Sequence, residues 1–299
     1  MRKLIKSILN QLPYVRGLRE QVDNVGTYPP GHFYSPIPNR QQITERLEFL
    51  KGERSELAGI NLNKDKQMEL LRRFQPFYKE LPFSEEKTPT CRYYFNQRVF
   101  CYADAIFLYS FLRLMQPARI IEVGSGFSSA VMLDTVDRFF SNRPAMTFIE
   151  PYPDDLKRLL RPEDRGNVTV IEDRVQKVST DRFAELQDGD LLFIDSSHVM
   201  KCGSDLQYLL FDVIPRLPVG VFVHFHDVFD RFEYPLDWLM KGWYWNEAYL
   251  LRAFLSYNNA WGIQLFGNYA CWAFPEFFAE NMPLCLKNRG GSLYIRRLA

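Results

Sequence analysis

From about residue 118 onward, the chain alternates short apolar runs with helical stretches. Apolar helical patterns cover Tyr102–Met115, which ends before Pro117, and Ser128–Asp137. Runs typical of buried strands cover residues 119–123, 146–149, 168–172, 190–194, 219–225, 261–267 and 292–296. Such alternation predicts a doubly wound α/β sheet. We expect this sheet to form one domain over residues 85–299, after a helical and proline-rich extension over residues 1–84.

The extension itself has a mixed pattern. Amphipathic helices are expected over Gln41–Lys51 and Lys64–Lys79, and one or two short basic helices over residues 1–24. Between them, Tyr28–Asn39 holds four prolines. Because proline fixes φ and disfavours a helix at the preceding residue, we expect this segment to be extended.

The stretch IIEVGSGFSS joins the first strand to the helix that follows it. Gly124 and Gly126 permit a tight turn and a close approach of a ligand to the backbone. The free N–H groups of the following helix would face that ligand. A tight turn without a ligand is the alternative. A nicotinamide site is not favoured, because Ser129 takes the place of the third glycine of a dinucleotide fingerprint.

The run from Glu122 to Ser128 resembles the first motif of class I S-adenosylmethionine-dependent methyltransferases, from which it departs at Ser128. Glu150, 24 residues after Gly126, ends the next strand, where that family has an acid for the ribose hydroxyls. The resemblance covers residues 118–299. It implies a seven-stranded Rossmann-like sheet whose last strand is antiparallel beside the fifth, and the whole chain resembles a bacterial group of unassigned substrate.

The same resemblance implies a set of residues for the cofactor S-adenosylmethionine. It assigns the methionine moiety to Glu122, Gly124, Ser125 and Gly126, the ribose to Glu150, and the adenine to the turn from Asp173 to Val175, with Asp195 also at the cofactor.

Acids and histidines gather at the ends of the fourth and fifth strands. Three of the four histidines lie there, in the runs Asp195-Ser-Ser-His198 and His224-Phe-His226-Asp227. A resemblance to metal-dependent O-methyltransferases implies a divalent metal (Mg, Mn or Fe) at Asp195, His226 and Asp227. The alternative is a capping Asp195 with a satisfied histidine pair.

His198 is predicted to act as the general base for the acceptor hydroxyl, in the first turn of a helix starting at residue 196 or 197. The alternative is a histidine that caps the strand end. With Asp195 and His226, His198 completes the predicted catalytic residues.

The acceptor is expected to meet the proline-rich segment. In an extended chain His32 and Tyr34 point the same way, so we predict that they form part of the acceptor site. A strap packed on the outside of the sheet is the alternative. The aromatic-rich run after Asp227 is expected to shape the same pocket.

Charge and cysteine content restrict the setting. A formal net charge of +1 argues against a nucleic-acid binder. No apolar run reaches the roughly 18 residues of a membrane span, although the basic N-terminus would allow weak peripheral membrane contact. Five cysteines without a CxxC pair indicate reduced thiols and a cytoplasmic protein.

The sequence thus predicts an O-methyltransferase for a small hydroxylated acceptor, such as a sugar, a glycan or a natural-product-like compound. Two alternatives remain. One is a non-haem iron hydroxylase-like enzyme that uses Asp195, His198 and His226. The other is a non-catalytic interaction protein on the same fold. The oligomeric state is not predicted.

Overall fold

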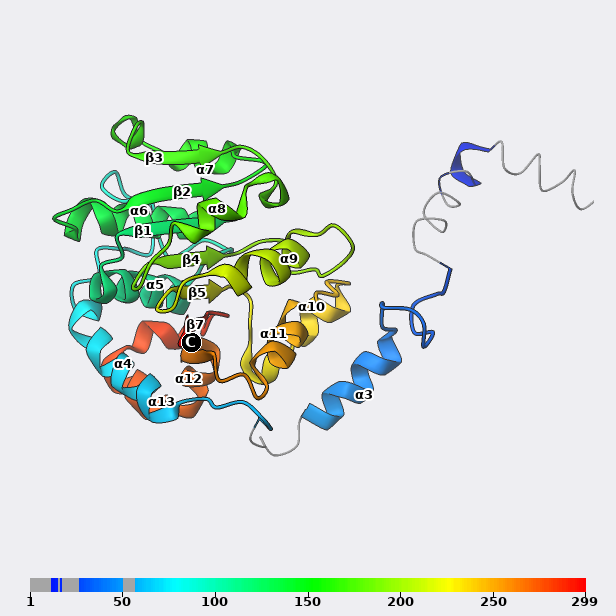
Figure 1. The fold of residues 1–299 in the computed structure, drawn as a ribbon. Helices are drawn as coiled ribbons and strands as arrows, with labels where there is room; N and C mark the ends of the chain where they lie inside the picture. The colour runs from blue at the N-terminus through cyan, green and yellow to red at the C-terminus, as the bar shows by residue number, and fades with distance from the viewer. Residues whose placement is uncertain (1–11, 16, 18–26, 51–56) are drawn as a thin grey trace, which may run out of the picture. The chain divides into compact units, whose positions relative to one another are not determined.

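The computed structural model describes residues 12–15, 17, 27–50 and 57–299, and the chain divides into two compact units (Figure 1). One unit comprises residues 1–56 and 235–244, in which α3 (Arg40–Leu50) packs against α10 (Leu236–Met240). The other comprises residues 57–234 and 245–299. The basic helices expected over residues 1–24 fall almost wholly outside the described residues.

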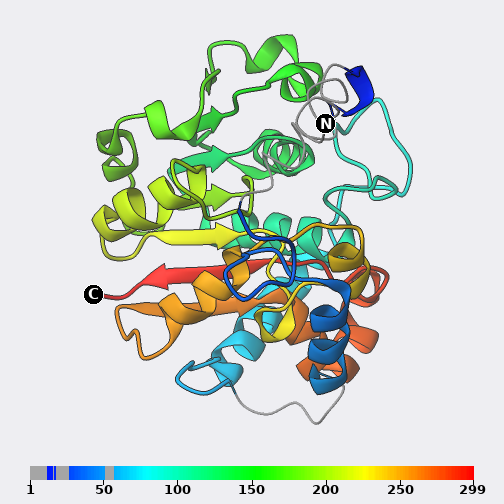
Figure 2. The same ribbon diagram turned by 90° about the vertical axis from the view of Figure 1, so that its right-hand side faces the viewer.

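The larger unit is built on a seven-stranded sheet with the order β3-β2-β1-β4-β5-β7-β6. Neighbours from β3 to β5 pair in parallel, and β7 pairs antiparallel with both β5 and β6. Figure 2 shows the red arrow of β7 running against the yellow arrow of β5. The strands are β1 (Arg119–Val123), β2 (Ala145–Ile149), β3 (Val168–Ile171), β4 (Leu191–Ile194), β5 (Phe222–Phe225), β6 (Trp261–Phe266) and β7 (Leu293–Arg297). The predicted doubly wound, seven-stranded fold is confirmed.

Helices cover both faces of this sheet (Figure 1). The connections through α6 and α9 leave β1 and β4 in opposite directions along the sheet, and right-handed crossovers then place these helices on opposite faces. The helices of this unit are α4 (Lys64–Tyr78), α5 (Tyr102–Met115), α6 (Phe127–Phe139), α7 (Asp154–Leu159), α8 (Thr180–Ala184), α9 (Asp205–Tyr208), α11 (Glu247–Leu255), α12 (Gly267–Ala273) and α13 (Pro275–Asn281).

Helix α5 lies at the centre of the hydrophobic core. It packs against α4 and α6, and every residue from 103 to 112 is buried. A helix that is apolar on all sides is stable only when it is enclosed by neighbours. Its bounds are those the sequence predicts. None of the described helices is long and apolar enough to cross a membrane.

Two expectations from the sequence need correction. The fifth strand begins at Phe222 instead of residue 219, because Gly220 adopts a φ of +91° in a turn. The segment Tyr28–Asn39 is not extended. Gly31 donates from its backbone N–H to the carbonyl of Ile37 (2.8 Å), which closes a loop, and the ring of Tyr28 stacks on His32 at 4.5 Å.

Candidate functional site

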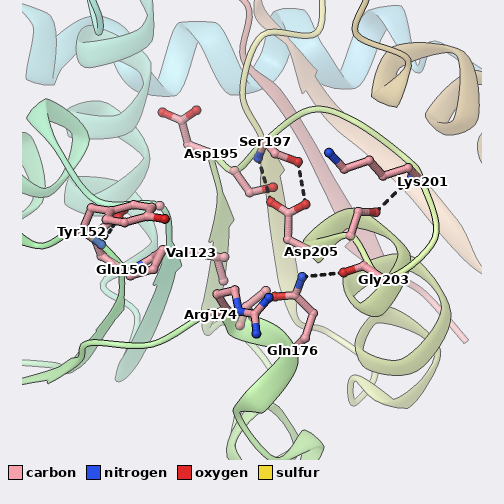
Figure 3. Close-up of a pocket in the computed structure, with 15 residues that line it drawn as sticks. Val123, Glu150, Tyr152, Arg174, Gln176, Asp195, Ser197, Lys201, Gly203 and Asp205 are labelled. Carbon is pink, nitrogen blue, oxygen red and sulfur yellow. Dashed lines mark hydrogen bonds between the residues drawn. The ribbon is translucent and has the colours of Figure 1, made fainter. Parts of the chain in front are cut away.

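A cavity of about 540 Å³ opens at the carboxyl ends of β1 to β4 (Figure 3). The crevice at this edge, where the strand order reverses, is the usual ligand site of an open α/β sheet. Four of the predicted cofactor residues line the cavity: Gly124, Glu150, Val175 and Asp195. The other four, Glu122, Ser125, Gly126 and Asp173, are not among its lining residues.

At Gly124 the backbone approaches the end of β4 very closely. Its φ is +81°, and a Cβ at this position would lie 1.8 Å from the carbonyl oxygen of Asp195. Only glycine fits such a backbone at such a distance. The predicted glycine turn therefore brings the end of β1 directly against the end of β4.

Glu122 lies beneath this turn instead of facing the cavity. Its carboxylate is fully buried and accepts hydrogen bonds from the hydroxyls of Ser128 (2.6 Å) and Ser129. Burial raises the pKa of Glu122 to about 8, although the two serine hydroxyls act to lower it. Ser128, the departure from the family motif, thus provides a hydrogen bond that joins β1 to α6.

Glu150 also lines the cavity, directly after β2 and next to the glycine turn. Its two oxygens accept hydrogen bonds from the backbone N–H groups of Ser125 (3.1 Å) and Tyr152 (2.8 Å). These bonds fix the carboxylate at the cavity surface, where hydroxyl donors of a ligand can also reach it. Asp173, in contrast, is turned to solvent, and its pKa is lowered by its ion pair with Lys177.

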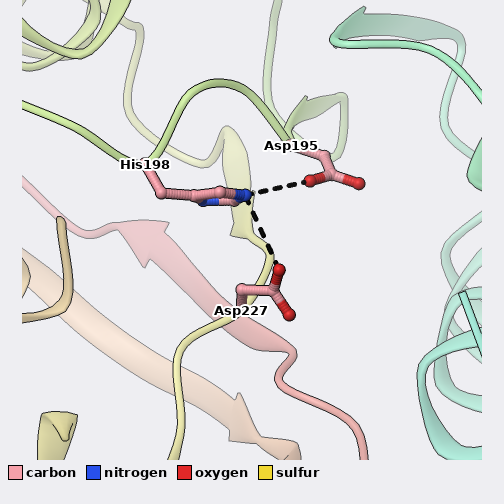
Figure 4. A group of neighbouring side chains, drawn as sticks. All are labelled: Asp195, His198 and Asp227. Atoms are coloured by element: carbon pink, nitrogen blue, oxygen red, sulfur yellow. Dashed lines mark ion pairs between the residues drawn. The ribbon is translucent and has the colours of Figure 1, made fainter. Parts of the chain in front are cut away.

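A cluster of three side chains lies where β4 and β5 end (Figure 4). The Nε2 atom of His198 is 3.4 Å from Oδ1 of Asp195 and 3.6 Å from Oδ2 of Asp227. One ligand atom from each residue lies within 4.8 Å of the others. On its other side, Nδ1 of His198 is 2.8 Å from Oε2 of the buried Glu247.

His198 reaches this cluster from a loop and not from the helix that the sequence predicts. Its backbone has a φ of +58°, and the following helix, α9, starts only at Asp205. The carbonyl of His198 accepts hydrogen bonds from the N–H groups of Asn246 (3.1 Å) and Glu247 (3.2 Å). The start of α11 therefore holds the loop in place.

Comparison with known proteins identifies the fold and its chemistry. A protein of Archaeoglobus fulgidus, described as uncharacterized, is 36% identical over 170 residues, which are 54% of this chain and 74% of that protein. A family model described as a methyltransferase domain matches residues 121–228, from β1 to just past Asp227. The chain belongs to the class I S-adenosylmethionine-dependent methyltransferases. The predicted family, the enzyme class and S-adenosylmethionine as the cofactor are confirmed, whereas the divalent metal stays a prediction.

Solved methyltransferases share the general arrangement at low similarity. The structure of the Podospora anserina methyltransferase PaMTH1 with S-adenosylhomocysteine is 14% identical, covers 88% of this chain and 98% of its own, and has a TM-score of 0.45. The O-methyltransferase TomG of Streptomyces achromogenes, in complex with S-adenosylmethionine, is 12% identical, with coverage of 86% and 96% and a TM-score of 0.43.

Two other histidines of the methyltransferase, His224 and His226, are buried slightly more than His198. Nε2 of His226 is 3.5 Å from Oδ1 of Asp227, but the group that could hold a metal contains His198 in its place. The predicted ligand set, which included His226, therefore differs from the observed group. His224 stacks on Phe193 at 3.9 Å, and its Nε2 lies 3.1 Å from the hydroxyl of Ser292.

The charges in the cluster perturb one another strongly. Burial acts to lower the pKa of His198, but hydrogen bonds and charges from Asp195 and Glu247 outweigh it and raise the pKa well above its usual value. Burial also opposes ionisation of Asp195, yet His226 and His198 hold its pKa below the usual range. For Asp227, burial dominates and raises the pKa. The carboxyl groups and imidazoles are thus coupled within one buried cluster.

One predicted pair of residues lies in the other unit, and one residue of the cluster was not predicted. His32 and Tyr34 belong to the smaller unit, and their role at the acceptor stays a prediction. Glu247 was missed, because it lies 49 residues from His198 at the end of an aromatic run, where a single acid gives no signal of its own. Only the docking of α11 reveals it.

Proposed function

We propose that this methyltransferase transfers the methyl group of S-adenosylmethionine to a hydroxyl oxygen of a small acceptor, such as a sugar, a glycan or a natural-product-like compound. The observation that carries the proposal is the double position of Asp195. This residue lines the cofactor cavity and also belongs to the cluster with His198 and Asp227. An acceptor held at the cluster would therefore stand next to the methyl donor.

We further propose that the cluster holds a divalent metal. Two carboxylates and one imidazole form a donor set that suits Mn²⁺ or Fe²⁺, and Mg²⁺ less well because of the imidazole. Neither the 3.4 Å nor the 3.6 Å contact of His198 Nε2 is a strong hydrogen bond. A bound cation would lower the pKa of an acceptor hydroxyl and orient it.

The residues of the chain supply binding and orientation. Methyl transfer is an in-line displacement, in which the acceptor oxygen bonds to the methyl carbon as the carbon–sulfur bond breaks. Glu150 would accept hydrogen bonds from the ribose hydroxyls, and the turn at Gly124 would let the methionine moiety lie against the backbone. Glu122 would act from below, by holding the turn through Ser128 and Ser129.

The two alternative functions are not favoured. A hydroxylase-like iron site would need two histidines and one carboxylate, but the observed group has one histidine and two carboxylates. A non-catalytic interaction protein would have no need of the cavity and the cluster side by side.

The test uses the purified protein with S-adenosylmethionine and a panel of hydroxylated sugars, glycans and phenols, and S-adenosylhomocysteine is the measured product. Activity should fall on exhaustive chelation and return with added Mn²⁺. If calorimetry finds no binding of S-adenosylmethionine or S-adenosylhomocysteine, the function is refuted.

If methyl transfer survives chelation and elemental analysis finds no metal, the metal is refuted and the three residues act directly on the acceptor. The matched variants are His198→Gln, which should lose activity, and Asp190→Asn, which should keep it. Asp190 is also buried, but it binds Arg119 at the opposite edge of the sheet.

A further inference from the structure

We propose that the tripeptide Trp245-Asn246-Glu247 fixes the position and orientation of His198. Within it, Glu247 is the positioning residue that keeps Nε2 of the imidazole directed at the cation site. This inference rests on the proposed metal at Asp195, His198 and Asp227. The sequence assigned this aromatic run to the acceptor pocket. The contacts of the tripeptide instead give it a role in fixing one side chain.

Glu247 fixes the edge of the ring. Its carboxylate is 1% exposed, and Oε2 lies 2.8 Å from Nδ1 of His198. Its second oxygen has no hydrogen-bond partner among the described residues. Burying a carboxylate is unfavourable unless its contacts compensate. We therefore assign the role of Glu247 to its contact with His198. A carboxylate at Nδ1 holds the proton there and leaves the lone pair of Nε2 free for a metal.

Asn246 fixes the backbone. His198 has a left-handed backbone conformation that few residues other than glycine adopt. The N–H groups of Asn246 and Glu247 both donate to its carbonyl. The side chain of Asn246 also accepts a hydrogen bond from the N–H of Met200 (2.6 Å) and donates one to its carbonyl (3.2 Å). The loop is thus clamped on both sides of residue 199.

Trp245 covers a face of the ring. Its ring centroid lies 4.4 Å from that of His198, with 37° between the two planes. The ring of Tyr234 packs against Trp245, with 6.0 Å between the two ring centroids. Tyr234 is itself held in place, because its hydroxyl accepts a hydrogen bond from the N–H of Ala248. Backbone, edge and face of His198 are therefore restrained by three consecutive residues.

The result of these restraints is the direction of Nε2. This atom faces both Asp195 and Asp227 at distances too long for good hydrogen bonds, while the three ligand atoms stay close enough to share one cation. A ring that turned freely would lose this arrangement. Outer partners of this kind change metal affinity by about 10- to 100-fold.

The experiment measures Mn²⁺ binding by electron paramagnetic resonance and calorimetry in the full-length protein. Glu247→Gln keeps an acceptor for Nδ1 but removes the charge, and it should weaken Mn²⁺ binding by about 10-fold. Glu247→Ala removes both and should weaken it by up to about 100-fold. The affinity for S-adenosylhomocysteine should not change in either variant, because Glu247 does not line the cofactor cavity. Asp190→Asn is the control and should bind Mn²⁺ as the parent does.

A second measurement does not depend on the alanine variant being folded. Nitrogen NMR of the parent protein loaded with diamagnetic Zn²⁺ in place of paramagnetic Mn²⁺ should show the proton of His198 on Nδ1, and Glu247→Gln should keep it there. A proton on Nε2 would overturn the inference. So would equal Mn²⁺ affinities in the parent and both Glu247 variants, with the proposed function intact. If the parent itself binds no Mn²⁺, the proposed metal fails, and this inference fails with it.

Discussion

Two buried clusters in the larger unit each surround one basic side chain with three carboxyl groups. In the first, Arg92 lies 2.8 Å from Asp134, 2.7 Å from Asp137 and 2.8 Å from Asp164. Asp134 also accepts hydrogen bonds from two backbone N–H groups, those of residues 92 and 93. Each contact is a short, charge-assisted hydrogen bond, and the cluster joins α6 to the segments on both sides of it.

The second cluster also places three carboxyl groups around one basic side chain, but its distances differ. His198 has one short contact, to Glu247, while Asp195 and Asp227 remain 3.4 and 3.6 Å away. A planar guanidinium has enough donors to satisfy three carboxylates, whereas an imidazole has two. The number of charged groups therefore does not distinguish the structural cluster of Arg92 from the functional cluster of His198. The distances between the charged groups do.

The largest expected effect tests the structural cluster. Arg92→Met should lower the free energy of unfolding by about 3–5 kcal/mol, because it leaves buried carboxylates without their partner. Urea denaturation measures this loss. Arg158→Met, which removes an exposed pair with Asp155, is the control. The interpretation fails if Arg92→Met costs no more than the control, or if folded Arg92→Met binds S-adenosylhomocysteine less tightly.

The next effect should lower activity far more than stability. Asp195→Asn should lower kcat for methyl transfer by about a hundredfold, or about 2.7 kcal/mol in the barrier. It also removes a carboxylate whose pKa the neighbouring histidines lower, so the free energy of unfolding should fall slightly, and by less than in Asp134→Asn. Steady-state kinetics and urea denaturation are compared on one preparation. A loss of stability as large as that of Asp134→Asn would erase the distinction between the clusters.

Glu150 shares one feature with each cluster. Backbone N–H groups fix its carboxylate, as in the Arg92 cluster, and the carboxylate lines a cavity where a ligand can reach it. Glu150→Ala should weaken binding of S-adenosylmethionine by about 1.5–3 kcal/mol, the range for hydrogen bonds to a charged group. Isothermal calorimetry measures the affinity. Asp173→Ala, at an acid outside the cavity, should bind as the parent does. Equal losses in both variants would contradict the assigned role.

The last effect is spread over several pH units and concerns a buried carboxyl group that has no cation beside it among the described residues. Glu122 has a pKa of about 8 in the folded protein, against an ordinary value of 4.5. The folded state therefore keeps a proton that the unfolded state loses in this range. The stability that Glu122 contributes is complete below the ordinary value and declines as the pH rises towards 8, by at most about 1.4 kcal/mol per pH unit.

Glu122→Gln keeps a neutral partner for the two serines and should flatten this decline. Urea denaturation at several pH values between the two pKa values measures it. His226, whose pKa the charges of Asp227 and Asp195 raise to about 8 against the effect of burial, adds a decline of the same sign in both proteins. An unchanged slope in Glu122→Gln would show that Glu122 is ionised in the folded state.

The sequence by itself determined the elements and the first half of the site. Helix Tyr102–Met115 and strand Arg119–Val123 have the predicted bounds, because apolar periodicity and the stops at Pro117 and Gly124 are local properties of the backbone. Gly124, Glu150 and Asp195 could be assigned to one cavity, since parallel strands bring their carboxyl ends to one edge of the sheet.

Only the tertiary structure decided the partners across long separations. Arg92 and Asp164 are 72 residues apart, and His198 and Glu247 are 49 apart. No local pattern marks such pairs, because they form when separate helices and loops dock on the sheet. The same docking gave His198 its left-handed backbone and placed it, rather than His226, with the two aspartates. Local sterics and hydrophobicity fix where strands and helices form, whereas the direction of each buried charge depends on the packing of all of them together.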